Sequence, residues 1–120
     1  MLPGIKQFDL TGKAAIITGG SKGLGQAMGA GLASAGADVM LVSRNLDEAQ
    51  AAADRIGHDF GHKAIAHQCD VSRQEETEAL AAAALESLGR VDILVNNAGI
   101  NTRGAIDELT YEQFREVQDI

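Results

Sequence analysis

The sequence predicts an α/β fold in which helices cover both faces of a parallel sheet. Short apolar runs alternate with segments whose apolar residues recur at helical spacing, and this order is typical of parallel strands joined by right-handed crossovers. The first run, residues 14–17, is wholly apolar, as expected of a strand buried on both faces. Glycines follow it directly, and a helical segment begins near Gly23. We therefore expect one doubly wound sheet with strand order 3-2-1-4.

Length and composition restrict the class of protein. A chain of 120 residues suffices for one domain and is short for two. The net charge of −7 argues against a general nucleic-acid surface. No apolar run approaches the roughly 20 residues of a membrane span, and residues 1–6 lack the apolar core of a secretory signal. The single cysteine, Cys69, fits a reducing compartment, so a cytoplasmic location is expected.

The first half of the chain gives two strands and two helices after a lead-in. In residues 1–13, Phe8 and Leu10 are expected to pack against the sheet. The helix after the first strand ends at Gly36, with Gly29 and Gly31 interpreted as positions of close packing on the sheet. Its expected inner face contains Leu24, Ala27, Met28, Gly31, Leu32 and Ala35.

Residues 39–42 form the expected second strand. Asn45 followed by Glu48 resembles a capping box and starts the next helix, which Gly57 and Gly61 end. The expected inner face of this helix contains Leu46, Ala49, Ala53, Ile56 and Phe60.

The second half continues the alternation from a third strand at residues 64–69. Ser72 with Glu75 predicts a capping box for a helix that Gly89 ends, and residues 91–95 form strand four at the edge. That helix is expected to pack through Leu80, Ala81, Ala84, Leu85 and Leu88. Thr110 with Gln113 caps a last helix, which is expected to carry Tyr111, Phe114 and Val117 inward.

The glycine-rich loop after the first strand is the strongest candidate for a ligand site. Glycines allow a tight turn and a close approach of the backbone, and the N-terminus of the following helix suits a pyrophosphate. The ammonium group of Lys22 could reach a phosphate from inside the loop. The alternative is an ordinary glycine turn between strand and helix. The candidate residues are Gly19, Ser21, Lys22, Gly23, Leu24 and Gly25.

The loop after the second strand, Ser43, Arg44 and Asn45, indicates which nucleotide is bound. Folds that prefer NAD place an acidic residue here against the ribose 2′-hydroxyl. A guanidinium binds a 2′-phosphate through paired hydrogen bonds, so Arg44 and Lys22 favour NADP over NAD. The alternative is that Arg44 is a solvated surface side chain. Asp38 opens the strand and lies at the wrong end to touch the ribose.

Two further loops meet at the same edge of the predicted sheet. Asp70 and Val71 follow the third strand, and Asp70 could accept a hydrogen bond from an adenine amino group. A carboxylate placed before the next helix is an equally good interpretation of Asp70. The small residues Asn97, Ala98 and Gly99 follow strand four and leave room for a flat ring or a ribose.

Together these motifs resemble the short-chain dehydrogenase/reductase family. Residues 18–25 match its TGxxxGxG pattern, residues 96–99 match its NNAG pattern, and Asp70 matches the aspartate that the family places beside adenine. The resemblance implies a Rossmann fold and hydride transfer between a nicotinamide and a small alcohol or carbonyl substrate. It also implies that Asn96 supports the sheet, that Ala98 and Gly99 line the cofactor, and that the parent protein is a homo-oligomer.

The family's catalytic residues have no counterpart in this sequence. The family uses an asparagine, a serine and a tyrosine followed four residues later by lysine. Here Tyr111 is followed by Arg115 and lies far upstream of the catalytic tyrosine's place, so it is interpreted as a packing or surface residue. We therefore expect residues 1–120 to be the N-terminal, NADP-binding portion of a longer oxidoreductase domain. The rival class is a nucleotide-binding module that catalyses nothing.

The remaining candidates have simpler interpretations. His58 and His62 are four residues apart, but Gly57 and Gly61 interrupt the helix, and no metal site is predicted. Cys69 is expected to be a small buried side chain. Arg103 falls where the family's substrate loop begins and could attract an acidic substrate, although a solvated loop arginine is the more ordinary interpretation. The apolar strand four is expected to promote self-association.

Overall fold

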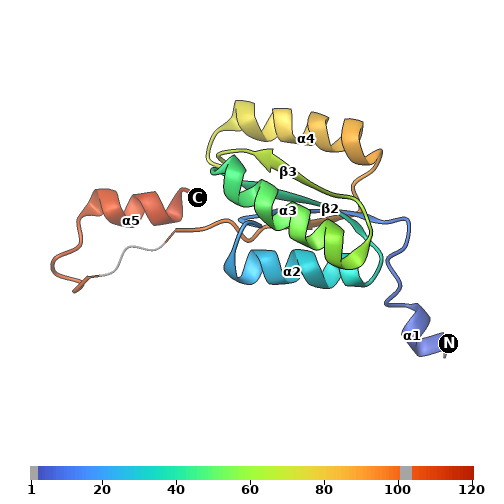
Figure 1. Cartoon of the computed structure of the whole chain (residues 1–120). Helices are drawn as coiled ribbons and strands as arrows, with labels where there is room; N and C mark the ends of the chain where they lie inside the picture. The colour runs from blue at the N-terminus through green and yellow to red at the C-terminus, as the bar shows by residue number, and fades with distance from the viewer. Residues whose placement is uncertain (1–2, 101–103) are drawn as a thin grey trace.

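A single parallel sheet of four strands forms the centre of the molecule (Figure 1). The structure is a computed structural model and describes residues 3–100 and 104–120. The strand order β3-β2-β1-β4 confirms the prediction. The strands are β1 Ala14–Thr18, β2 Asp38–Ser43, β3 Ala64–Gln68 and β4 Ile93–Val95. All pairs are parallel, so the carboxyl ends of the four strands lie at one edge of the sheet.

Three long helices cover the two faces of this sheet (Figure 1). They are α2 Gly23–Ser34, α3 Leu46–Phe60 and α4 Gln74–Leu88. Side chains alternate across each strand, so Ile17 packs with α2 and α3 whereas its neighbour Ile16 packs with α4. All five residues of β1 are buried for this reason. Within the described residues, none of the helices combines the length and apolar content needed to cross a bilayer.

Helix α2 packs through a narrower face than predicted. Its buried residues are Gly25, Gly29 and Ala33, whereas Leu24 is 77% exposed. A Cβ at Gly29 would lie 2.8 Å from Leu41 Cδ2, which confirms the close packing expected there. Gly31 has open space around it, so the same expectation was wrong at that position. Small residues bring the helix backbone close to the sheet, and the larger side chains are displaced to the flanks.

Helix α3 begins after Asn45, as predicted, and ends at the second of the two glycines that were predicted to end it. The Asn45 side chain accepts a hydrogen bond from the Glu48 backbone N–H at 3.2 Å. The helix continues through Gly57 and ends at Gly61, whose φ of 73° is left-handed. Its buried face is made mostly of alanines, while Leu46 and Phe60 remain more than a third exposed at its margins. The buried residues are Ala49, Ala52, Ala53 and Ile56.

Helix α4 ends at Gly89 as predicted but does not begin with the predicted capping box. Arg73 occupies the cap position without a side-chain hydrogen bond. The Ser72 hydroxyl and backbone N–H instead both donate to Asp70 Oδ1, at 2.6 and 3.0 Å, and hold Ser72 in a turn before the helix rather than at its cap position. Leu80 and Ala84 are buried in the packed face. Leu88 is half-buried, and the predicted face residues Ala81 and Leu85 are exposed.

Helices α1 and α5, near the two ends of the described chain, lie away from the sheet (Figure 1). A short helix that was not predicted, α1 Pro3–Lys6, precedes Phe8, which is 70% exposed rather than packed. Leu10 does pack on the core, as predicted. Helix α5, Tyr111–Gln118, has the predicted capping box of Thr110 and Gln113. The predicted inward packing of α5 was wrong, because its side chains are not buried: exposure is 70% for Tyr111, 58% for Phe114 and 38% for Val117.

Candidate functional site

A cleft of about 330 Å³ lies at the carboxyl ends of the strands, and all four strand-ending loops contribute to it. Doubly wound folds bind ligands in this place, where the strand order reverses. Eleven of the predicted site residues line the cleft: Gly19, Ser21, Lys22, Ser43, Arg44, Asn45, Asp70, Val71, Asn97, Ala98 and Gly99. Sequence reasoning missed the lining residues Val42, Glu48, Cys69, Ile100 and Ile120. Gly23, Leu24 and Gly25 were predicted as site residues and lie outside the lining.

The glycine loop presents the start of α2 to this cleft. Gly19 has φ of 65° and Gly23 has φ of 61°, which are conformations that residues with a Cβ rarely adopt. Lys22 occupies the cap position of α2 in an extended conformation and makes no side-chain cap hydrogen bond. The first backbone N–H groups of α2 therefore have no side-chain partner there, and with the Lys22 ammonium they form a set of donors that fits an anionic group.

Gly25 joins the loop to its neighbour rather than lining the cleft. A Cβ on Gly25 would lie 2.1 Å from the Gly19 carbonyl oxygen and 2.6 Å from Asn97 Nδ2. No side chain fits in that space, so glycine is required for the turn to close on itself. Leu24, one residue earlier, points out of the site, as its exposure shows.

The hydroxyl of Thr18 connects the loop after β1 to the loop after β4. Thr18 Oγ1 donates to the Val95 carbonyl at 3.2 Å and accepts from the backbone N–H groups of Asn97 and Ala98, each at 3.0 Å. Asn97 Nδ2 also donates to the Gly19 carbonyl at 3.2 Å. The bridging side chain in this structure is thus Asn97, whereas the resemblance assigned sheet support to Asn96, which is exposed. The sequence does contain a signal for the role of Thr18, because this residue is polar and ends an otherwise apolar strand.

Hydrogen bonds from side chains hold the loop that carries Arg44 from two sides. Ser43 Oγ accepts from the Asn45 N–H at 3.1 Å and from the Ser21 hydroxyl at 3.3 Å. Gln68 Nε2 donates to the Arg44 carbonyl at 3.1 Å. The Arg44 side chain is exposed and lines the cleft, so this loop presents a cation to that space.

Asp70 lies where both of the interpretations left open by the sequence placed it. It lines the cleft, and it comes four residues before the start of α4 at Gln74. Its Oδ1 accepts from the hydroxyl and the backbone N–H of Ser72 at 2.6 and 3.0 Å. These hydrogen bonds, with smaller contributions from the charges of Arg44 and Arg73, hold the pKa of Asp70 below its usual value. The carboxylate is therefore ionised at neutral pH and acts there as an acceptor.

Cys69 forms a small apolar part of the cleft wall, which confirms the expectation of a buried side chain. It is 2% exposed. Burial raises the pKa of the Cys69 thiol, and the nearby Glu76 and Asp70 carboxylates add to that effect. The side chain consequently remains a neutral thiol.

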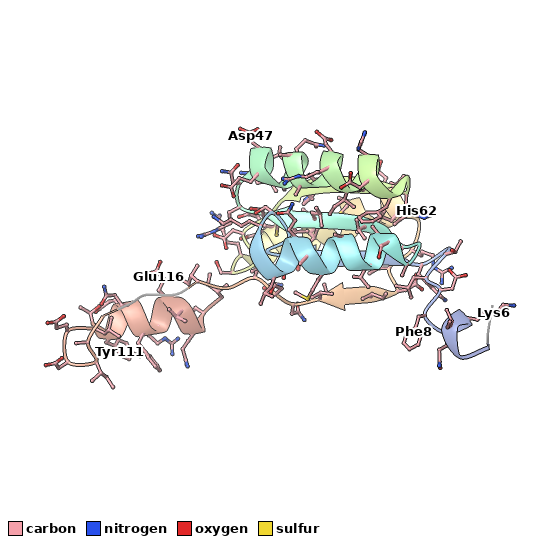
Figure 2. All side chains as sticks on the ribbon, turned by 60° about the horizontal axis from the view of Figure 1, so that its bottom comes forward. Lys6, Phe8, Asp47, His62, Tyr111 and Glu116 are labelled. Atoms are coloured by element: carbon pink, nitrogen blue, oxygen red, sulfur yellow. The ribbon has the colours of Figure 1, made fainter. Side chains whose placement is uncertain are left out.

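The other candidates from the sequence lie apart from this cleft. Tyr111 is on α5, away from the sheet (Figure 2). Arg103 lies outside the described residues. His58 Nδ1 lies 3.3 Å from Oδ1 of its neighbour Asp59, and His62 follows the C-terminal end of α3 (Figure 2). No group of three His, Cys, Asp or Glu side chains suited to a metal ion occurs within residues 3–100 and 104–120.

The architecture is Rossmann-like: a doubly wound parallel sheet whose ligand cleft is built from a glycine loop and three other strand ends. The chain belongs to the short-chain dehydrogenase family, because the model of that family, described as short chain dehydrogenase, matches residues 13–120.

Relatives of known sequence and structure agree with this assignment. An uncharacterized oxidoreductase of Methylorubrum extorquens is 41% identical over 114 residues, which cover 92% of this chain and 45% of that protein. A short-chain type dehydrogenase/reductase from Mycobacterium marinum superposes with a TM-score of 0.93 at 36% identity, over 98% of this chain and 47% of the other. The RhlG/NADP active-site complex of Pseudomonas aeruginosa gives a TM-score of 0.87 at 34% identity, over 99% and 44%. The chain thus spans less than half the length of these relatives.

Proposed function

We propose that this chain is the cofactor-binding part of an NADP-dependent oxidoreductase that transfers hydride between NADP(H) and an alcohol or carbonyl compound. One observation carries the choice of cofactor: Lys22 and Arg44 line the same cleft, and Ser43 stands at the end of β2 where an acidic residue would favour NAD. The bound nicotinamide would supply or accept the hydride. The structure of an NADP complex among the related proteins supports this choice.

Each loop has a distinct part in the proposed binding. The backbone of residues 19–25, with Gly23, Leu24 and Gly25 shaping the turn, would hold the pyrophosphate at the N-terminus of α2. Arg44 and Lys22 would bind the 2′-phosphate. Asp70 and Val71 would contact the adenine, and Asn97, Ala98 and Gly99 would line the path toward the nicotinamide. We assign no catalytic residue within this chain.

The substrate class, the assembly and the location of the whole protein belong to the same proposal. The substrate is a small molecule, and the whole protein assembles with further copies of itself, as the family resemblance implies. A single cysteine in the chain supports a cytoplasmic location.

Comparative titration of NADPH and NADH tests the cofactor choice. The protein is best prepared with the coding sequence that follows Ile120, and affinities are measured by calorimetry or by nicotinamide fluorescence. We expect tighter binding of NADPH. Arg44→Ala should weaken NADPH binding about ten- to hundredfold, the effect of losing charged hydrogen bonds to a phosphate, and should leave NADH binding unchanged.

Arg55→Ala provides the matched control. Arg55 is an exposed arginine on α3 that does not line the cleft, so its loss removes the same charge at a distance from the site. Equal affinity for the two nucleotides in the unsubstituted protein, or an unchanged NADPH affinity after Arg44→Ala, would contradict the proposal.

A further inference from the structure

A carboxylate shares the cleft with the two basic side chains. Glu48 lines the cleft together with Arg44 and Asn45, although it comes from the first turn of α3 rather than from a strand-ending loop. Its backbone N–H donates to Asn45 Oδ1 at 3.2 Å, which fixes the position of the residue within that turn. The side chain is exposed and borders the cleft.

The usual local partner of this carboxylate is already occupied. In a capping box the third residue of the helix accepts a hydrogen bond from the cap residue's N–H. Here the Asn45 N–H donates to Ser43 Oγ at 3.1 Å instead. Among the residues that the structure describes, no ion pair joins Glu48 to Arg44 either. Glu48 therefore acts on the cleft as an unneutralised negative charge beside Arg44.

These two charges have opposite effects on a phosphate in that part of the cleft. Arg44 attracts a 2′-phosphate, while the carboxylate of Glu48 repels it. A ribose that carries a free 2′-hydroxyl in the same place is neutral and has no such conflict.

We propose that Glu48 is a specificity-determining residue that opposes Arg44 and limits the preference of this cleft for the 2′-phosphorylated nucleotide. The preference for NADP over NAD is then modest, and one substitution increases it. This inference rests on the proposed binding of NADP in the cleft.

Asp47 offers a close control within the same turn of α3. It carries the same charge and precedes Glu48 directly, but it does not line the cleft. Figure 2 shows Asp47 on the outer side of the helix, pointing away from the sheet. Both residues also interact with the helix dipole, so a comparison of the two separates the effect on the cleft from the effect on the helix.

The test uses two nucleotide fragments that differ in the 2′-phosphate. Binding of 2′,5′-ADP and 5′-AMP is measured by calorimetry at low ionic strength for the unsubstituted protein, Glu48→Gln and Asp47→Asn. Glu48→Gln should tighten 2′,5′-ADP about three- to tenfold, the size expected for one partly screened charge several ångströms away. Binding of 5′-AMP should change less than about twofold, and added salt should reduce the gain.

The outcomes separate this inference from the proposed function. If the unsubstituted protein binds 2′,5′-ADP but Glu48→Gln gives no gain, the inference is wrong and the proposed function stands. If Asp47→Asn produces the same gain as Glu48→Gln, the gain comes from the general negative charge at the start of α3, and the specific role proposed for Glu48 is wrong. If neither fragment binds, the proposed function fails and the inference fails with it.

Discussion

Thr18 shows how one hydroxyl group organises the site at the scale of a residue. The side chain is 6% exposed, and its oxygen serves as donor to one loop carbonyl and as acceptor for two loop N–H groups. A buried N–H that loses its partner costs about 1–3 kcal/mol. The hydroxyl therefore stabilises the turn after β4 in the shape that forms one wall of the cleft.

Replacement of Thr18 by valine tests this role. Thr18→Val keeps the shape of the side chain but leaves the N–H groups of Asn97 and Ala98 without their acceptor. We expect the free energy of unfolding to fall by about 2–4 kcal/mol, measured by urea denaturation, with weaker nucleotide binding. Thr18→Ser, which keeps the oxygen, should lose about 1 kcal/mol for the missing methyl group. Equal losses in both variants would show that the hydrogen bonds contribute nothing.

The capping-box pattern succeeded in one place and failed in another. Thr110 and Gln113 form the predicted capping box. Ser72 matches the same pattern, but its hydroxyl and backbone N–H both donate to Asp70 Oδ1 in a turn of their own, and α4 begins one residue later, after Arg73. The sequence contains the pattern in both places and does not show that the turn at Asp70 keeps Ser72 out of the cap position.

The cleft residues were predictable for a different reason. Parallel strands end at one edge, so the loops after the strands had to meet, and the structure brings them together. Glu48 was missed because it lies a turn inside α3, where only the three-dimensional path of the helix shows that its side chain borders the same space.

At the scale of an element, α2 shows that size outweighs hydrophobicity where a helix approaches a sheet closely. The sequence predicted Leu24, Ala27 and Gly31 on the inner face, and all three are exposed. The buried positions are Gly25, Gly29 and Ala33. A prediction based on apolar character places the larger side chains on the inner face. The short distance between the helix and the sheet leaves room there for only the smallest side chains.

Two glycine-to-alanine substitutions in α2 should have opposite effects. Gly25→Ala would place a Cβ 2.1 Å from the Gly19 carbonyl oxygen, so the loop must move. We expect a loss of several kcal/mol, about 3 or more, and loss of nucleotide binding. Gly31→Ala meets nothing within 4 Å in the same helix and should stabilise the protein by about 0.5–1 kcal/mol through helix propensity. Thermal or urea unfolding of the pair measures both values, and equal effects would contradict the packing of α2.

At the scale of the whole molecule, the carboxylate of Asp92 joins the amino ends of β1 and β4 and is itself paired with Arg90. Asp92 Oδ2 accepts from the Ala14 N–H at 2.9 Å and from Arg90 Nε at 2.8 Å, and its Oδ1 accepts from Arg90 Nη2 at 2.6 Å. The hydrogen bonds from Arg90, followed by the one from Ala14, hold the pKa of Asp92 below its usual value.

The lowered pKa of Asp92 predicts a dependence of stability on acid. A carboxylate with a lowered pKa binds fewer protons in the folded state than in the unfolded state, so its contribution is complete above the unfolded pKa of about 3.9. That contribution is lost as the pH falls through the lower folded pKa. We expect unfolding to become easier below about pH 4, with a smaller dependence in Asp92→Asn.

Denaturation by urea between about pH 3 and pH 7 measures this dependence. Asp54→Asn is the matched control, because Asp54 is an exposed carboxylate on α3 whose side chain accepts only from Gln50 in the same helix. A pH profile of Asp92→Asn that coincides with that of the unsubstituted protein would contradict the role of this ion pair.

The topology of the whole sheet could be predicted, while the packing of both chain ends could not. Alternating strands and helices with right-handed crossovers leave few arrangements, and the motifs selected the order that is observed. Phe8 and the apolar side of α5 were expected inside because their spacing marks a face suited to burial. Such spacing does not specify a partner surface, and both segments lie away from the sheet (Figure 1).

The hydrogen bonds of Thr18 span 77 to 80 positions along the chain. During synthesis the glycine turn leaves the ribosome well before the stretch that fastens it, so the nascent chain carries a turn without these hydrogen bonds until about 80 further residues have been made. We therefore expect the proposed nucleotide site to be complete only after Ala98 has emerged, while the helices made in the interval can already pack on the earlier strands.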